Sequence, residues 1–146
     1  MSGLERERLR AWLRLLRKTR AVEARLREAL KAAHGTTLPR FDVLAALDRH
    51  REGLRMSDLS RHLMVSNGNV TGIVDRLEED GLVERVEVEG DRRAMRVRLT
   101  PAGAARFAAM AADHAGWIDA AFARLGAAEL AQLTGLLERI GEEAGK

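Results

Sequence analysis

Several absences in this chain of 146 residues exclude whole classes of protein. It has no cysteine, so disulfides, zinc–thiolate sites and thiol redox sensing are excluded. Aromatic residues make up only 3% of the chain, too few for the exposed rings on which single-stranded nucleic acids stack. No apolar run approaches the roughly 18 residues of a membrane helix, and the first residues, MSGLERERLRAW, contain no signal-peptide core. We therefore expect a cytoplasmic protein without membrane contact.

The remaining composition indicates one folded domain with an uneven charge distribution. Hydrophobic residues make up 46% and charged residues 32% of the chain, which is typical of a folded protein rather than a disordered one. Residues 1–31 hold ten basic and four acidic side chains, whereas residues 61–98 hold seven and eight. Any nucleic-acid reader within residues 61–98 must therefore use individually placed groups rather than bulk positive charge.

Residues 66–100 contain the most informative pattern in the sequence. Val70, Ile73, Val74 and Leu77 follow the spacing of one apolar helix face, which predicts a partly buried helix that begins near Ser66. The centre of the opposite face holds Gly68, Gly72 and Glu79, flanked by Asn69, Thr71, Asp75 and Arg76. Each interior glycine costs about 1 kcal/mol relative to alanine. Two glycines four residues apart on an exposed face therefore indicate room for a DNA groove to approach the backbone.

A β-hairpin is expected directly after this helix, with Gly81 at the helix C-terminus. Leu82, Val86 and Val88, and then Val97 and Leu99, alternate with charged residues, and Gly90-Asp91 supplies the turn between the two runs. The alternating charges are Glu87, Glu89, Arg96 and Arg98, which we expect on an outer face where they pair across the strands. Arg92 and Arg93 remain near the tip. A helix followed by a hairpin with a basic tip predicts a winged helix-turn-helix.

The run from Leu38 to Gly103 resembles the MarR family of bacterial transcription regulators. The matching stretches are PRFDVLAAL, then MSDLSRHLMVSNGNVTGIVDRLEEDGLVER, then DRRAMRVRLTPAG. The specific part is the wing pattern that extends from Asp91 and Arg93 through Val97, Leu99 and Thr100 to Gly103. The resemblance implies a mainly α fold with a small β-hairpin wing (α+β), with helical dimerisation segments at residues 1–35 and 101–146 and a DNA-binding domain at residues 36–100.

Individual residues receive roles from their chemistry and from the resemblance. Asn69 and Thr71 have short polar groups suited to base edges. The resemblance places Arg93 in the minor groove, with Asp91 steadying the wing, and Ser57 at a phosphate. Arg76 reaches either a phosphate or Asp75, Glu79 or Asp80 on its own helix. The full DNA-binding set is Ser57, Ser66, Asn67, Gly68, Asn69, Thr71, Gly72, Arg76, Asp91, Arg92 and Arg93.

Helices are also expected on both sides of the predicted DNA-binding domain at residues 36–100. Apolar residues keep helical spacing from Leu9 to Ala33 and again from Phe107 to Leu125, and a short seam runs from Leu130 to about Ala144. These stripes expose more apolar surface than a monomer of this size tolerates, which predicts a homodimer. The arginines of the first helix reach DNA, remain solvated, or pair with the acidic C-terminal helices. We also expect a short helix from Pro39 to His50, a turn over Arg51–Leu54 and a helix opened by Ser57.

His114, on an apolar helix face, has two readings. It is either a satisfied interior residue or part of an effector pocket, since the resemblance implies that small aromatic acids or phenols bind between the dimer helices and the reader. The pocket candidates are Trp12, Leu16, Phe41, His114, Trp117 and Ile118. A ligand there would release DNA by favouring a dimer with mis-spaced reading helices.

We expect neither an enzyme nor a metal protein. No Ser-His-Asp set, phosphate-cradling glycine loop or HExxH motif appears, the four histidines have no metal-ligand spacing, and no cofactor is indicated. The sequence thus predicts a dimeric DNA-binding regulator on a palindromic operator, most simply a repressor released by an effector. The alternative is a winged-helix architectural or protein-interaction module without an effector.

Overall fold

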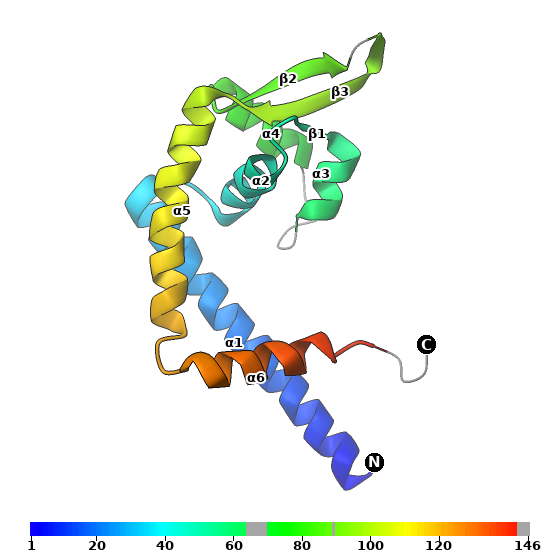
Figure 1. The fold of residues 1–146 in the computed structure, drawn as a ribbon, viewed down its shortest axis with the longest axis vertical. Helices are drawn as coiled ribbons and strands as arrows, with labels where there is room; N and C mark the ends of the chain where they lie inside the picture. The colour runs from blue at the N-terminus through cyan, green and yellow to red at the C-terminus, as the bar shows by residue number, and fades with distance from the viewer. Residues whose placement is uncertain (64–69, 89, 143–146) are drawn as a thin grey trace. The chain divides into compact units, whose positions relative to one another are not determined.

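The computed structural model describes residues 1–63, 70–88 and 90–142, and for residues 91–94 it describes the backbone alone (Figure 1). The chain forms two compact units, Met1–His114 and Ala115–Lys146, which are described separately below. The fold is mainly α with a small antiparallel sheet, as the sequence predicts. Within the described ranges, none of the helices combines the length and apolar character that a membrane crossing requires.

The first helix, α1 (Gly3–His34), is the long helix that the apolar spacing predicts. Its start is capped by Ser2, whose hydroxyl accepts a hydrogen bond from the backbone of Glu5. It ends at Gly35, which has a φ of 60° and donates its N–H to the Lys31 carbonyl. Only Leu26 and Leu30 of α1 are buried, so the helix contributes its C-terminal part to the core of the first unit.

Three short helices follow α1 in the first unit. α2 (Leu38–Arg49) begins after the cap residue Thr37, and α3 covers Met56–His62. α4 is described over Val70–Glu79. The core of the first unit is apolar, and its largest fully buried side chains are Leu30, Leu44, Leu47, Leu59, Leu77, Met110, Val43, Val74, Val83 and Val97.

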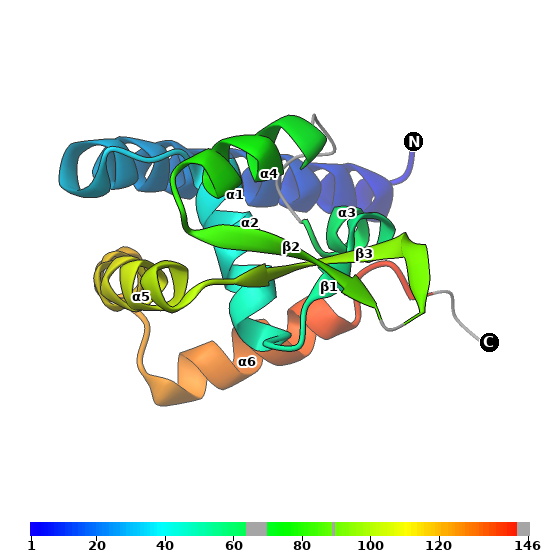
Figure 2. The same ribbon diagram turned by 90° about the horizontal axis from the view of Figure 1, so that it is seen from above.

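A three-stranded antiparallel sheet follows, in which β3 (Asp91–Leu99) lies between β1 (Leu54–Arg55) and β2 (Val83–Val88) (Figure 2). The sequence predicted the hairpin, but it was wrong about β1, because Leu54 pairs with Val97 instead of closing a turn. Gly53 makes this approach possible. It has a φ of 100°, and a Cβ atom there would lie 2.9 Å from the Val97 carbonyl oxygen.

The register of the hairpin corrects the expected charge pairing. Val83 opposes Leu99, and Glu84 opposes Arg98, whose Nε lies 2.7 Å from the Glu84 carboxylate. Glu87 opposes Met95 and therefore lies on the other face of the strand from Glu84. Charges do pair across the strands, but the acidic partner is Glu84, because Val83 rather than Val86 occupies the core side.

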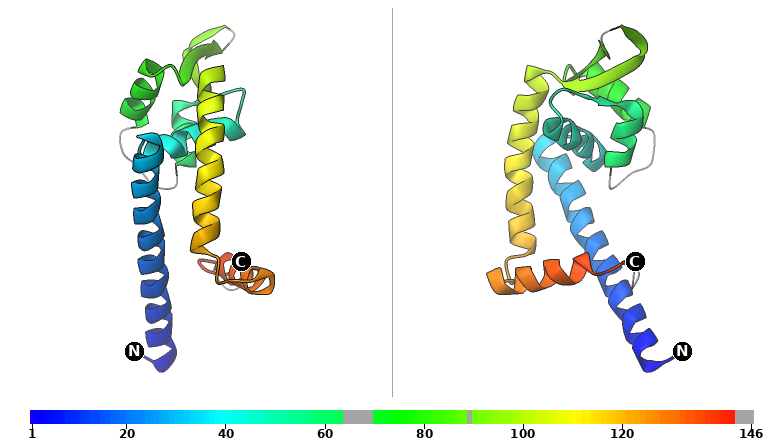
Figure 3. Two further views of the ribbon diagram at one scale, coloured as in Figure 1. Left: turned by 90° about the vertical axis from the view of Figure 1, so that its left-hand side faces the viewer. Right: turned by 45° about the vertical axis from the view of Figure 1, so that its right-hand side comes forward.

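The chain leaves β3 through Thr100 into α5 (Pro101–Ala121), which carries it into the second unit (Figure 3). α5 was expected to continue to Leu125 but ends at Ala121. The second unit contains the end of α5 and α6 (Ala127–Glu138), which begins after Gly126. The expected seam to Ala144 is too long, because α6 ends at Glu138 and Gly141 has a φ of 85°. None of the twelve residues of α6 is buried.

Candidate nucleic-acid interface

The candidate reading helix is α4, and its two faces differ as the sequence predicts. Val70, Val74 and Leu77 are buried, with Leu77 only 1% exposed. The backbone N–H of Gly81 bonds to the Glu78 carbonyl and that of Leu82 bonds to the Leu77 carbonyl, so a glycine C-cap ends the helix. The expected start at Ser66 lies outside the described residues.

On the outer face of α4, Thr71 and Arg76 are exposed and Gly72 is partly exposed. Four of the predicted contacts, Ser66, Asn67, Gly68 and Asn69, lie outside the described residues. Arg76 lies 3.9 Å from the Glu79 carboxylate and 3.8 Å from that of Asp80, and its side chain is 57% exposed. Ion pairs this long and exposed contribute little, so the guanidinium can turn to a phosphate at small cost.

Asp75 does not pair with Arg76 but with Arg85 of β2, a residue that the sequence reasoning missed. The Arg85 guanidinium donates one hydrogen bond to Asp75 over 2.5 Å and another to Glu78 over 2.7 Å. The hydrogen bond to Asp75 is the main reason that the pKa of Arg85 is raised above its ordinary value. The available signal was the spacing of Asp75 and Glu78, which places two carboxylates on one side of the helix.

The wing is the hairpin of β2 and β3, with Gly90 at a φ of 80° in the turn. Asp91 is the first residue of β3 rather than part of the turn. The register shifts beside it, because Glu87 opposes Met95 whereas Val88 opposes Asp91. The backbone of Arg92 and Arg93 therefore lies in the irregular part of the ladder, while the side chains of Asp91, Arg92 and Arg93 lie outside the described part of the structure.

The helix before the reading helix, α3, presents Ser57 in its first turn, where the side chain is exposed. The helix begins one residue earlier than expected, at Met56, and within the described chain its cap residue Arg55 makes no side-chain capping bond. The carboxylate of Asp58 lies 4.0 Å from Arg61 in the same helix. Ser57 is thus accessible to a phosphate, as its predicted role requires.

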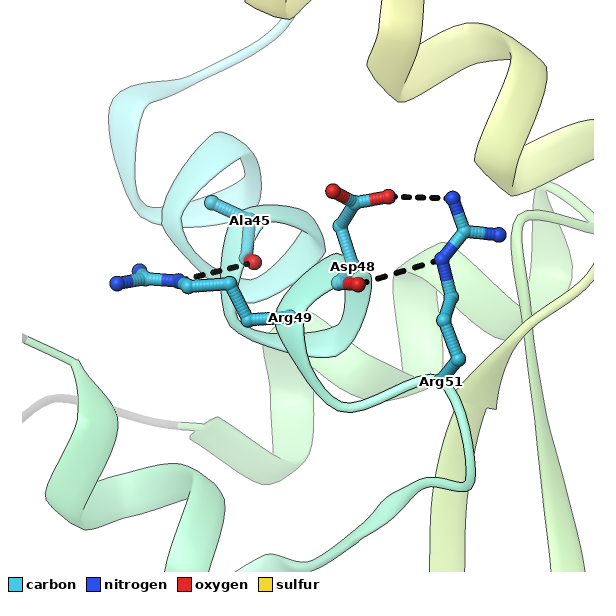
Figure 4. A network of polar contacts seen from close by, with 4 residues as sticks. All are labelled: Ala45, Asp48, Arg49 and Arg51. Carbon is cyan, nitrogen blue, oxygen red and sulfur yellow. Dashed lines mark hydrogen bonds and ion pairs between the residues drawn. The ribbon is translucent and has the colours of Figure 1, made fainter.

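Two arginines at the end of α2 hold the turn into β1 (Figure 4). Arg51 donates to the Asp48 carboxylate over 2.6 Å and to the Asp48 carbonyl over 3.2 Å. Arg49 donates to the Ala45 carbonyl over 3.5 Å. The Asp48 carbonyl is one of those that the last turn of a helix leaves without an intrahelical partner, so Arg51 has a structural role at this turn.

Two of the side chains predicted for an effector pocket, those of Phe41 on α2 and His114 on α5, contact each other. The rings of Phe41 and His114 stack with centroids 4.6 Å apart, and Phe107, which the prediction missed, lies 5.5 Å from Phe41. Burial lowers the pKa of His114, which favours the neutral imidazole. The other four candidates lie on α1 and in the second unit. Trp12 is 53% exposed and Leu16 partly buried on α1, while Trp117 and Ile118 belong to the second unit.

A half-buried carboxyl group, that of Asp42, lies on α2. Among the described residues, Oδ2 of Asp42 has no hydrogen-bond partner although it is buried. Burial is the main reason that the pKa of Asp42 is raised to about 6; the negative charge of Glu23 adds to the effect and Arg49 opposes it. Asp42 is therefore a group whose charge the fold does not stabilise.

Histidine side chains form two further contacts between helices of the first unit. Nε2 of His34 lies 2.7 Å from the Asp113 carboxylate and thereby links the end of α1 to α5. The rings of His50 and His62 lie 4.8 Å apart, at the ends of α2 and α3. Within residues 1–63, 70–88 and 90–142, no three histidine, aspartate or glutamate residues are grouped so as to hold a metal ion.

Comparison with known proteins places this geometry among regulators. A family model described as "MarR family" matches residues 34–94. The transcriptional activatory protein BadR of Rhodopseudomonas palustris is 42% identical over 87 residues, which are 58% of this chain and 45% of BadR. The chain thus spans less than half the length of this and the next curated relatives that it matches.

Two solved structures are similar over almost the whole chain. A MarR family transcriptional regulator from Silicibacter pomeroyi is 31% identical, with a TM-score of 0.81 and 96% of each chain covered. A MarR variant from E. coli in complex with operator DNA is 26% identical, with a TM-score of 0.79, and the match covers 97% of this chain and 100% of that one.

Proposed function

Because the chain belongs to the MarR family of transcription regulators, we propose that it is a sequence-specific regulator, not an enzyme, that binds double-stranded DNA. One observation carries the proposal. The exposed face of α4 and the hairpin of β2 and β3 lie on one compact unit, joined by Arg85. A helix and a wing held together in this way suit a major groove and the backbone or minor groove beside it.

The proposed contacts follow from the chemistry of each side chain. Asn69 and Thr71 meet base edges, while Gly68 and Gly72 let the backbone of the helix approach the groove. Arg93 enters the minor groove, and Asp91 steadies the wing. Phosphates are met by the remaining residues of the set, which are Ser57, Ser66, Asn67, Arg76 and Arg92.

We further propose that the protein acts as a homodimer on a near-palindromic operator. Large apolar side chains are exposed near the N-terminus of α1, on α6 and just after it, including Leu9 at 46%, Leu136 at 57% and Ile140 at 61%. Burial of such side chains against a second copy removes them from water. Residues 1–35 and 101–146 would then form the dimer, and residues 36–100 would present two reading helices about one DNA turn apart.

The proposed effector is a small aromatic acid or phenol, and the supporting feature is the cluster of Phe41, Phe107 and His114. Stacked rings and a half-buried neutral imidazole can hold an aromatic ring and one hydrogen-bonding group. Release of DNA by this ligand would make the protein a repressor. The name of BadR as an activatory protein is a reason to test both signs of regulation.

The test is a gel-shift titration with the DNA upstream of the protein's own coding region, in excess non-specific competitor. We expect a competitor-resistant complex that Thr71→Ala weakens and that the exposed-site control Thr19→Ala leaves unchanged. A panel of aromatic acids and phenols is then added to the complex. Binding without sequence preference and without ligand release would favour an architectural module instead.

A further inference from the structure

The side chain of Arg85 on β2 donates two hydrogen bonds to the neighbouring helix α4. One goes to the carboxylate of Asp75 and the other, about one helical turn later, to the carboxylate of Glu78. Its guanidinium uses Nη2 for the first carboxylate and Nη1 for the second. The Arg85 side chain is 25% exposed, whereas the carboxylates of Asp75 and Glu78 are 54% and 42% exposed. One planar cation of the wing therefore spans two anions of the reading helix.

Apolar contacts on its buried face and contacts at its C-terminal end also hold α4, and both are less directional than these ion pairs. The buried face of Val70, Val74 and Leu77 packs by apolar contact, which is not directional. The glycine C-cap at Gly81 fixes the end of the helix rather than its rotation about its axis. A guanidinium held by two charge-assisted hydrogen bonds is directional, because its donors lie in a fixed plane.

The position of the ion pairs that Arg85 makes with Asp75 and Glu78 matters for DNA recognition. Recognition requires the helix contact and the wing contact to lie at a set distance from each other. The exposed face of α4 around Thr71 must enter a groove while the hairpin reaches the adjacent backbone. The ion pairs of Arg85 join α4 directly to β2, the first strand of that hairpin. A small rotation of the helix would displace base contacts while leaving phosphate contacts largely intact.

We propose that Arg85 is a positioning residue that holds the reading helix at a fixed angle to the wing, and so sets sequence discrimination rather than overall DNA affinity. The inference rests on the proposed DNA-binding function. It does not make Arg85 a DNA contact, since its donors face Asp75 and Glu78.

The main alternative is that Arg85 acts only through its charge. The positioning role and the charge role predict opposite changes in DNA affinity when its two carboxylate partners are removed. If Arg85 only neutralises carboxylates near DNA, then removal of both carboxylates in Asp75→Asn/Glu78→Gln should tighten binding. If Arg85 positions the helix, the same double variant should bind the specific fragment more weakly although it has lost two negative charges. Arg85→Lys separates the readings again, because it keeps the charge but cannot bridge both carboxylates with a planar fork.

The experiment measures fluorescence anisotropy of the full chain with the upstream fragment and with a shuffled fragment of equal length. We expect Arg85→Gln and the double variant to lower the ratio of specific to non-specific affinity at least tenfold, with Arg85→Lys intermediate. The matched control is Arg98→Gln, which breaks an equally short ion pair, to Glu84, within the hairpin and leaves α4 untouched. It should change the ratio less than threefold.

Three outcomes overturn the inference while leaving the proposed function intact: an unchanged ratio in Arg85→Gln, tighter specific binding by the double variant, or full rescue by lysine. The absence of specific binding by the wild-type chain would instead overturn the proposed function. Circular dichroism melts accompany each variant. If Arg85→Gln does not fold, the double variant alone decides, because its side chains keep their size and remain exposed.

Discussion

The hydroxyl group of Thr100 donates a hydrogen bond to the backbone carbonyl of Gly81 over 2.7 Å, and it joins the start of α5 to the end of α4. The same oxygen accepts the backbone N–H of Gly103 over 3.0 Å and so caps α5. We expect Thr100→Val, which keeps the shape but loses the hydroxyl, to reduce the free energy of unfolding by about 1–2 kcal/mol. Thr100→Ser should retain most of that stability in urea unfolding at one protein concentration, and equal losses in both variants would contradict the hydroxyl's role.

Gly103 lies where α5 packs closely against Leu82, just after the end of α4. A Cβ atom at this position would lie 1.8 Å from the Leu82 carbonyl oxygen, and backbone cannot give way as a flexible side chain can. We expect Gly103→Ala to destabilise the protein by about 2–3 kcal/mol because the two segments must separate. The matched control is Gly116→Ala in the same helix, where no described heavy atom lies within 4 Å of the added Cβ. It should gain up to about 1 kcal/mol of helix stability.

Features with a local cause were predictable from the sequence. The end of α1 at Gly35 and the C-cap at Gly81 follow from the left-handed conformation that glycine tolerates. The buried face of α4 follows from helical spacing, because one element alone determines which side chains share a face. The start of α5 after Thr100-Pro101 belongs to the same group.

Features that depend on distant partners were not predictable. β1 is two residues long, too short to show a period of two, and it exists because β3 offers it an unpaired edge. Arg85 could not be assigned because its partners lie 10 and 7 residues earlier on another element. The aromatic contact of Phe41 with His114 had a signal in the apolar spacing, but the contribution of Phe107 depended on how α2 meets α5.

The half-buried carboxyl group of Asp42 predicts a pH-dependent stability. Its pKa is about 6 in the folded chain, against 3.8 for an unperturbed aspartic acid such as that of the unfolded chain, so the folded state binds its proton more tightly. The associated stabilisation is complete below about pH 4 and is lost as pH rises through about 6. We expect Asp42→Asn to raise the free energy of unfolding at pH 8 by at most about 3 kcal/mol, and not to raise it at pH 4. Urea unfolding across this range is the measurement.

Two neighbouring charges modulate this effect and supply a control. Glu23 raises the pKa of Asp42 and Arg49 lowers it. Glu23→Gln should therefore reduce the gain at pH 8 that Asp42→Asn produces, because part of the unfavourable energy is already removed. A gain from Asp42→Asn that is equal at pH 4 and pH 8 would show that its cause is packing rather than charge.

The exposed apolar residues of α6 predict the assembly state. Leu137 is 42% exposed in the single chain, and a charge placed at a buried dimer contact would be strongly unfavourable. We expect Leu137→Glu to sediment as a monomer at concentrations where the wild type is a dimer, and to lose specific DNA binding. Ala131→Glu introduces the same charge on α6 at a position turned well away from both Leu136 and Leu137, and it should remain dimeric. A dimeric Leu137→Glu would contradict the proposed role of α6.

The two arginines of the wing predict different kinds of DNA contact. Arg93 is proposed to enter the minor groove, whose width and potential depend on sequence, so Arg93→Ala should weaken specific binding at least tenfold without unfolding the dimer. Arg92 is proposed to meet a phosphate, so Arg92→Ala should weaken specific and non-specific binding alike and reduce the slope of log K against log salt by about one. Salt titrations of both variants by fluorescence anisotropy distinguish the roles. Because the two residues are adjacent in β3 and differ by no charge, each variant is the control for the other. Equal losses with equal salt slopes would mean that the wing contributes charge alone, and a wild-type affinity in Arg93→Ala would remove its assignment to the minor groove.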